Sequence, residues 1–199
     1  MMKKSFALIA VLLVGCMLLA GCSRDKEPAE AAIKAAEAAL GAAKGEAAKY
    51  VPDQVKGVES AIKGAKDAFE KKEYTQALNA AKDLPGKIKE LAAAAAAKKA
   101  ELTKAWEEMA AGLPKMVEAI KSRVDILSKS KKLPQGMDKG KLDGAKAGLE
   151  EITKTWTDAE GAFKGGNITD AIGKANAVKA KATEIMTALG MQPPPAAKG

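Results

Sequence analysis

The residues 142–163, LDGAKAGLEEITKTWTDAEGAF, carry the clearest helical pattern in the chain. Their apolar side chains recur at strictly alternating intervals of three and four, which places them on one face of an α-helix. The face consists of Leu142, Ala145, Leu149, Ile152, Trp156, Ala159 and Phe163. Such a helix must bury its apolar face against another helix, so this stretch predicts helices packed on helices.

Four other stretches have the same spacing: residues 55–69, 74–95, 102–127 and 168–189. Alanine, lysine and glutamate, which favour helices, dominate the chain from Pro28 onward, and no stretch alternates as a strand would. The pattern predicts an all-α fold, an elongated bundle of antiparallel hairpins with about five or six helices. Because alanine fills many core positions, we expect a thin core and modest stability.

Proline, glycine and polar residues divide this pattern into helices. Pro52 is predicted to open a helix, residues 71–73 to form a polar turn, and residues 128–137 to form the longest loop. Gly112 followed by Pro114 predicts the end of one helix and the start of the next. Pro85 lies within a stripe whose phase continues across it, so we expect a kink there.

Residues 68–78 match residues 162–172, which lie 94 positions later. Each segment is predicted to contain the end of one helix, a short turn and the start of the next helix. In the second segment, Asn167 is the predicted N-cap, and Asp170 follows three residues later. This pattern resembles the hairpins of TPR-like helical repeats and of small bacterial lipoproteins of unknown function. The TPR consensus and its 34-residue period are absent. Duplication and convergence on a common turn both explain the match.

Residues 1–22 have the composition of an export signal. Two lysines precede an apolar run at residues 6–19, which is shorter than the roughly 20 residues that span a bilayer. The run ends in Leu19-Ala20-Gly21-Cys22, which resembles the lipobox of bacterial lipoproteins. The resemblance implies that residues 1–21 are cleaved and that Cys22 carries diacylglycerol, with palmitate or a similar chain on its amino group.

Two alternatives to this interpretation exist. In one, lipidation occurs at Cys16, which follows a looser version of the same pattern. In the other, the protein is secreted without a lipid, and neither cysteine has a role.

With Cys22 as the first mature residue, the chain divides into three parts. Residues 22–28 form the lipidated cysteine and a tether, residues 29–190 the helical domain, and residues 191–199 a Pro-rich tail. A further division of the helical domain gives two hairpin halves, at about residues 29–128 and 138–190. Ser23 follows the cysteine, as it does in bacterial lipoproteins that are sent to the outer membrane. The resemblance therefore implies an outer-membrane lipoprotein that faces the periplasm.

The composition excludes many kinds of active site. The chain has no histidine, and its cysteines, Cys16 and Cys22, both lie in the predicted signal region, so His/Cys zinc sites, haem attachment and Ser-His-Asp or Cys–His catalysis are ruled out. The acidic pairs at residues 107–108 and 150–151 point to different helix faces, and residues 137–144 lack the acids of a calcium loop. We therefore predict no enzymatic activity, catalytic residue, metal or cofactor.

Several features concern packing or binding. The net charge is +8, and Lys129, Lys131 and Lys132 form one of the densest basic stretches. They are the candidate binding residues for an anionic lipid or envelope polymer, whereas nucleic acid is not expected beyond the inner membrane. Trp106 and Trp156 align with apolar stripes, either as core anchors or as a partner or glycan platform. Glycines at intervals of four (Gly41, Gly45, Gly140, Gly144 and Gly148) suggest close helix packing.

These observations favour a lipid-anchored protein of the cell envelope. Its expected role is structural or adaptor-like, through helix-mediated contacts with another envelope protein or with itself. The alternative is a binding module for an anionic envelope polymer or lipid, through the lysine-rich surface. The two functions differ in their response to salt, since only charge-driven binding weakens steeply as ionic strength rises.

Overall fold

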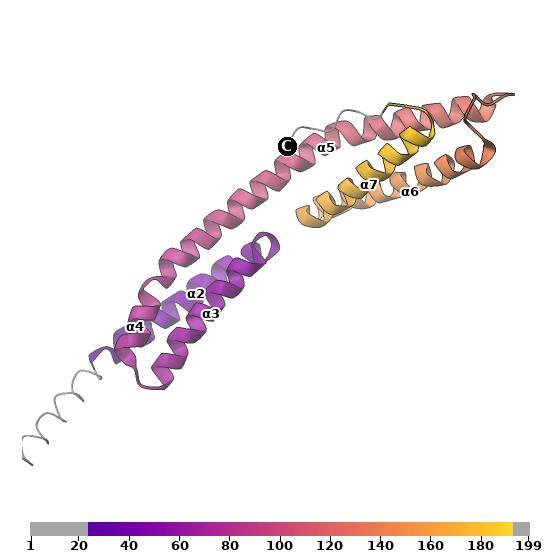
Figure 1. Ribbon diagram of the computed structural model, residues 1–199. Coiled ribbons are helices and arrows are strands. Elements are labelled where there is room, and N and C mark those ends of the chain that lie inside the picture. The colour runs from indigo at the N-terminus through magenta and orange to yellow at the C-terminus, as the bar shows by residue number, and fades with distance from the viewer. Residues whose placement is uncertain (1–23, 193–199) are drawn as a thin grey trace, which may run out of the picture. The chain divides into compact units, whose positions relative to one another are not determined.

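The computed structural model describes residues 24–192, and the predicted signal peptide, Cys22 and residues 193–199 of the tail lie outside this range. The described part is all-α, as predicted, and contains no strand. Figure 1 shows its helices. They are α2 (Lys26–Tyr50), α3 (Pro52–Glu70), α4 (Tyr74–Lys82), α5 (Leu84–Lys129), α6 (Lys139–Lys164) and α7 (Ile168–Ala188).

The chain divides into two compact units between Lys98 and Lys99, inside α5. The first unit contains α2, α3, α4 and the start of α5, and the second contains the rest of α5 with α6 and α7. The predicted division at residues 128–138 is therefore wrong. That loop has the composition of a linker, but Leu127 before it and Leu142 after it pack into the same core.

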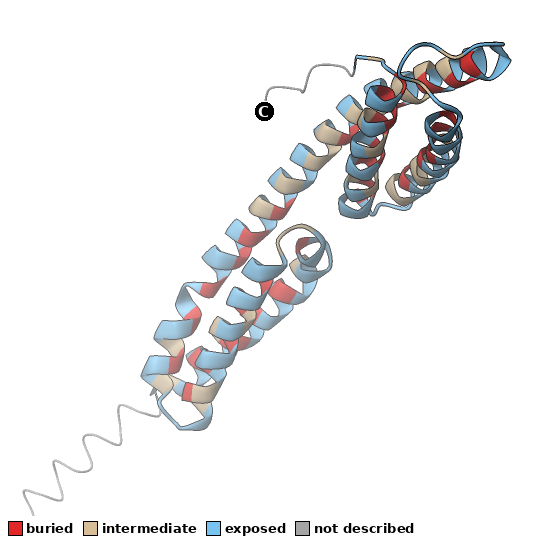
Figure 2. Ribbon diagram, turned by 45° about the vertical axis from the view of Figure 1, so that its right-hand side comes forward, coloured by how far each residue is buried: buried red, intermediate tan, exposed pale blue. Residues whose placement is uncertain are grey.

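Each unit has its own apolar core of buried residues, which recur along the inner helix faces (Figure 2). Half of the sixteen buried residues of the first core are alanines, which bring the helices close together but bury little area. Larger side chains fill the second core, among them Trp106, Leu113, Ile120 and Ile152.

The two turns of the 94-residue repeat have the same backbone hydrogen bonds. Both are Schellman motifs, in which two N–H groups beyond the helix donate to carbonyls of its last turn. In the first turn, the N–H of Glu73 donates to the carbonyl of Ala68 (3.0 Å) and that of Lys72 to the carbonyl of Phe69 (2.9 Å). In the second turn, the N–H of Asn167 donates to the carbonyl of Ala162 and that of Gly166 to the carbonyl of Phe163 (both 2.9 Å). Lys72 has φ +65° and Gly166 φ +77°, so the lysine occupies a conformation that suits glycine better.

The repeat extends well beyond the turns. In the helical stretch after the first turn, up to the end of the first unit, six positions are buried, and each has a buried counterpart 94 positions later. The pairs are Ala77 and Ala171, Ala81 and Ala175, Leu84 and Val178, Ile88 and Ala182, Leu91 and Ile185, and Ala95 and Leu189. The repeat therefore includes the turn and the buried positions of the helical stretch that follows it.

Helix α5 is continuous across Gly112 and Pro114, where the sequence predicted a boundary. Pro114 lies inside the helix although it cannot donate a hydrogen bond to the carbonyl of Ala110. The prediction was wrong because Leu113 and Ile120, on either side of the proline, are buried in one core and hold the helix together. At Pro85, by contrast, only Asp83 separates α4 from α5, and its φ of −87° and ψ of −10° are helical, which agrees with the predicted kink.

The helix starts also refine the predictions. Pro52 opens α3 as expected, and α2 begins at Lys26, so Pro28 belongs to its first turn and not to the tether. Asn167 occupies the predicted N-cap position of α7, but within residues 24–192 its side chain makes no capping hydrogen bond. Asp170 instead forms an ion pair with Lys174.

Of the glycines proposed to allow close packing, Gly148 is the one that does so against another helix. A Cβ added there would lie 2.8 Å from Cδ1 and 3.1 Å from Cγ1 of Ile185 on α7. A Cβ at Gly41, Gly45 or Gly144 would meet no atom within 4 Å of the described chain, so the expectation of close packing is wrong for these three. At Gly140 the nearest atom is a carboxylate oxygen of Asp138, at 3.3 Å.

The contrast between Gly144 and Gly148 predicts opposite effects of one substitution within α6. Gly144→Ala should raise the free energy of unfolding by about 0.5–1 kcal/mol, because alanine favours the helix and fits the open space. Gly148→Ala should lower it by about 1 kcal/mol, since the methyl group displaces Ile185. Urea unfolding followed by circular dichroism measures both, and equal effects at the two positions would contradict the assignment.

Candidate functional site

The predicted binding lysines lie at one end of the second unit. Lys129 is the last residue of α5, and Lys131 and Lys132 follow in the loop before α6; all three side chains are exposed. The loop is attached to the start of α6 by Lys141, whose Nζ donates to the carbonyl oxygen of Gly136 at 2.7 Å. The carboxylate of Asp138 caps α6 by accepting from the backbone N–H of Lys141, also at 2.7 Å. The three lysines therefore lie at the end of α5 and in a loop whose last residues are hydrogen-bonded to the start of α6.

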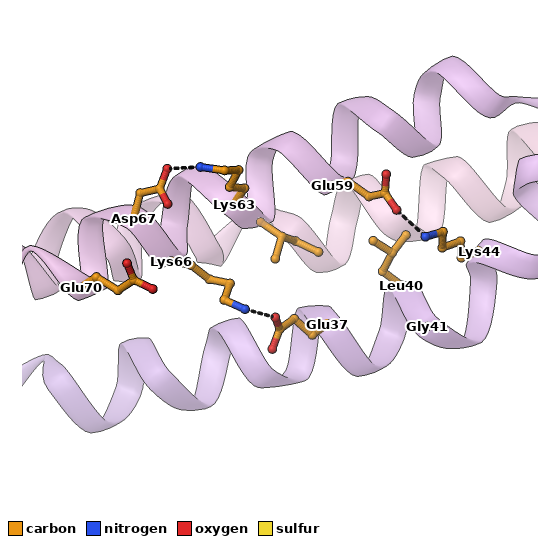
Figure 3. A pocket seen from close by; sticks show the side chains of 10 residues that line it. Glu37, Leu40, Gly41, Lys44, Glu59, Lys63, Lys66, Asp67 and Glu70 are labelled. Atoms are coloured by element: carbon orange, nitrogen blue, oxygen red, sulfur yellow. Dashed lines mark hydrogen bonds and ion pairs between the residues drawn. The ribbon is translucent and has the colours of Figure 1, made fainter.

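A shallow groove with a volume of about 400 Å³ lies between α2 and α3 in the first unit (Figure 3). Leu40 and Ile62 contribute its apolar lining, and Gly41 also borders it. The other lining residues are charged: Glu37, Lys44, Glu59, Lys63, Lys66, Asp67 and Glu70. A smaller groove of about 230 Å³ shares Glu37, Lys66 and Glu70 with it.

Ion pairs connect the two helices across the larger groove. Lys66 Nζ lies 2.7 Å from Glu37 Oε1, and Lys44 Nζ lies 2.7 Å from Glu59 Oε1. All four side chains are at least 40% exposed, so each pair contributes little to stability. These pairs were not predictable from the sequence, because the two members of each pair lie on different helices and far apart in the chain. Only the packing of α2 on α3 brings them together.

Within α3, Asp67 pairs with Lys63, with 2.8 Å between Nζ and Oδ2. Their hydrogen bond lowers the pKa of Asp67 and raises that of Lys63. The hydrogen bond from Lys66 to Glu37 likewise raises the pKa of Lys66. A lowered carboxyl pKa stabilises the fold at neutral pH, and this small contribution is lost as the pH falls through the acid range.

These pKa directions bear on what the groove can do. A general acid or base works best with a pKa near the working pH. The shifts of Lys63, Lys66 and Asp67 move away from neutrality, so these groups keep their charges at pH 7. Lys63, Lys66 and Asp67 thus line the groove as charged groups.

Three aromatic rings stack in the second unit. Trp106 on α5 lies 5.2 Å from Trp156 and 4.7 Å from Phe163 on α6, measured between ring centroids, with interplanar angles of 5° and 9°. Trp106 is 6% exposed, whereas Trp156 and Phe163 are half-buried. Trp106 is therefore a core anchor, and Trp156 packs on it from a position nearer the surface.

Other kinds of site find no support in the described part of the chain. Among residues 24–192, no three His, Cys, Asp or Glu side chains gather closely enough to hold a metal ion. The helices of the same range include none that is both long and apolar enough to cross a membrane. The acidic residues at 107–108 and 150–151 are exposed.

Comparison with known proteins adds no assignment. No family model, no curated protein and no solved structure matches this chain.

Proposed function

We propose that this chain is a lipid-anchored protein of the cell envelope, with a non-enzymatic structural or adaptor role through helical protein–protein contacts. The observation that carries the proposal is the repetition of one turn and the helical stretch after it, in which six buried positions recur 94 positions later. Each unit buries its apolar faces in its own core, which leaves the outer faces of its helices for contacts with other macromolecules.

The charges of the first unit support a contact role. Ion pairs join Glu37 with Lys66 and Lys44 with Glu59 across the α2–α3 groove. Charges of both signs around an apolar lining favour a partner of complementary charge and steer its approach. An outer-membrane protein facing the periplasm, lipidated at Cys22, would present these helices close to the membrane surface.

The lipid anchor is tested by metabolic labelling with palmitate. We expect the wild-type chain to incorporate the label and Cys22→Ser to lose it, because Cys22 stands at the cysteine position of the closer match to the lipobox. Cys16→Ser is the matched control and should keep the label. Labelling of Cys22→Ser, or its loss in Cys16→Ser, would refute lipidation at Cys22.

The adaptor role is tested by crosslinking in intact cells, followed by mass spectrometry of the products. We expect one discrete envelope protein, or a second copy of this chain, joined through residues of the helical units. The complex should survive increased salt, because helix docking depends mainly on apolar contact. Crosslinks spread over unrelated proteins would count against an adaptor.

A further inference from the structure

The end of the second unit that contains the predicted binding lysines is strongly basic. Residues 121–141 contain seven bases and two acids, giving this stretch a net charge of +5. The bases are Lys121, Arg123, Lys129, Lys131, Lys132, Lys139 and Lys141. All six lysines are exposed, and one of the two acids, Asp138, is engaged as the cap of α6. We call this stretch the basic end.

An exposed isoleucine lies within the basic end. Ile126 on α5 is 56% exposed, and among residues 24–192 it is the large hydrophobic residue that stands out as exposed. The core stripe of α5 passes through Val124 and Leu127, so Ile126 points away from the core. Residues three apart are neighbours on a helix surface, which places Arg123 and Lys129 on either side of Ile126.

The combination distinguishes between anionic partners. A soluble anionic polymer is held by charge alone and gains nothing from an exposed isoleucine. The surface of a bilayer uses both features: anionic headgroups attract the lysines, and an apolar side chain enters the boundary between headgroups and acyl chains. The basic end therefore fits a bilayer better than a polymer.

We propose that the basic end binds the surface of a bilayer that contains anionic phospholipids, with the lysines at the headgroups and Ile126 inserted between them. The inference deepens the alternative function of the lysine-rich surface by naming its partner. It requires neither the acylation of Cys22 nor an adaptor role.

The test uses residues 23–199, which lack the signal and the acylated cysteine but contain every described helix. The chain is sedimented with vesicles of phosphatidylcholine, with or without phosphatidylglycerol. We expect binding to the vesicles that contain phosphatidylglycerol, little binding to phosphatidylcholine alone, and a decrease as salt screens the charges.

Two variants of the basic end test its two components. Replacing Lys129, Lys131 and Lys132 by glutamine should weaken binding by roughly 100-fold, since each lysine near an anionic surface contributes about a fivefold increase. Ile126→Ser should weaken it by about 10-fold through the loss of the apolar side chain. The matched control replaces Lys82, Lys87 and Lys89, three exposed lysines of the first unit, by glutamine and should bind like the parent.

Three outcomes would overturn the proposal. One is equal binding to both kinds of vesicle. Another is an equal loss in the control variant, which would mean that net charge alone drives the binding. The third is unchanged vesicle binding by Ile126→Ser together with lysine-dependent binding of inorganic polyphosphate, which would assign the basic end to an anionic polymer. Unchanged circular dichroism shows that each variant is folded. Because the chain tested carries no lipid, failure here leaves the palmitate and crosslinking results unaffected.

Discussion

Trp106→Ala should lower the free energy of unfolding by about 3–5 kcal/mol, the largest loss expected from a single substitution in the second unit. The indole is 6% exposed and stacks on both Trp156 and Phe163, so its removal leaves a cavity and ends two aromatic contacts. Urea unfolding followed by circular dichroism measures the change.

Trp156→Ala is the matched control for this substitution. Trp156 belongs to the same stack but is half-buried, so its loss should cost less, about 2 kcal/mol. Two equal losses, or a larger one at Trp156, would show that Trp106 is not the principal anchor. A stable Trp106→Ala variant would contradict its place in the core.

Pro114→Ala should stabilise the protein by up to about 3 kcal/mol. Pro114 is exposed and lies inside α5, so its ring crowds the carbonyl of Ala110 and its nitrogen donates no hydrogen bond. Alanine restores the donor and removes the crowding without disturbing the buried Leu113 beside it. The expected result is a higher midpoint in urea and a higher Tm.

Pro85→Ala is the control for Pro114→Ala. Pro85 is the second residue of α5, where the backbone nitrogen has no intrahelical acceptor and proline is tolerated. Its replacement should therefore change stability far less than replacement of Pro114. Equal gains at the two prolines, or no gain at Pro114, would mean that α5 is not continuous at residue 114.

The helices α3, α6 and α7 and the turns at residues 71–73 and 165–167 were predictable from the sequence, whereas no apolar stripe predicted α2. Each depends on residues close together in the chain: the apolar spacing of residues 142–163, for example, or the Gly165-Gly166-Asn167 turn. The 94-residue repeat was also visible, although only the buried positions showed that it includes the following helix.

The candidate sites were less predictable. The sequence located Lys129, Lys131 and Lys132, but the exposure of Ile126 beside them follows from the position of the α5 core stripe. The groove between α2 and α3 depends on pairs such as Glu37 with Lys66, which lie on different helices, so that no local sequence pattern connects them.

The sequence by itself determined an all-α chain, its turns and most of its helix starts, because these follow from side-chain periodicity and backbone preference over a few residues. Only the tertiary structure determined that α5 continues through Pro114, that the units divide within α5, and that Gly148 and not Gly144 touches another helix. The reason is physical. The free energy gained by burial against distant residues is a sum over many contacts. That sum exceeds the free energy of the local conformational preference of one proline or glycine.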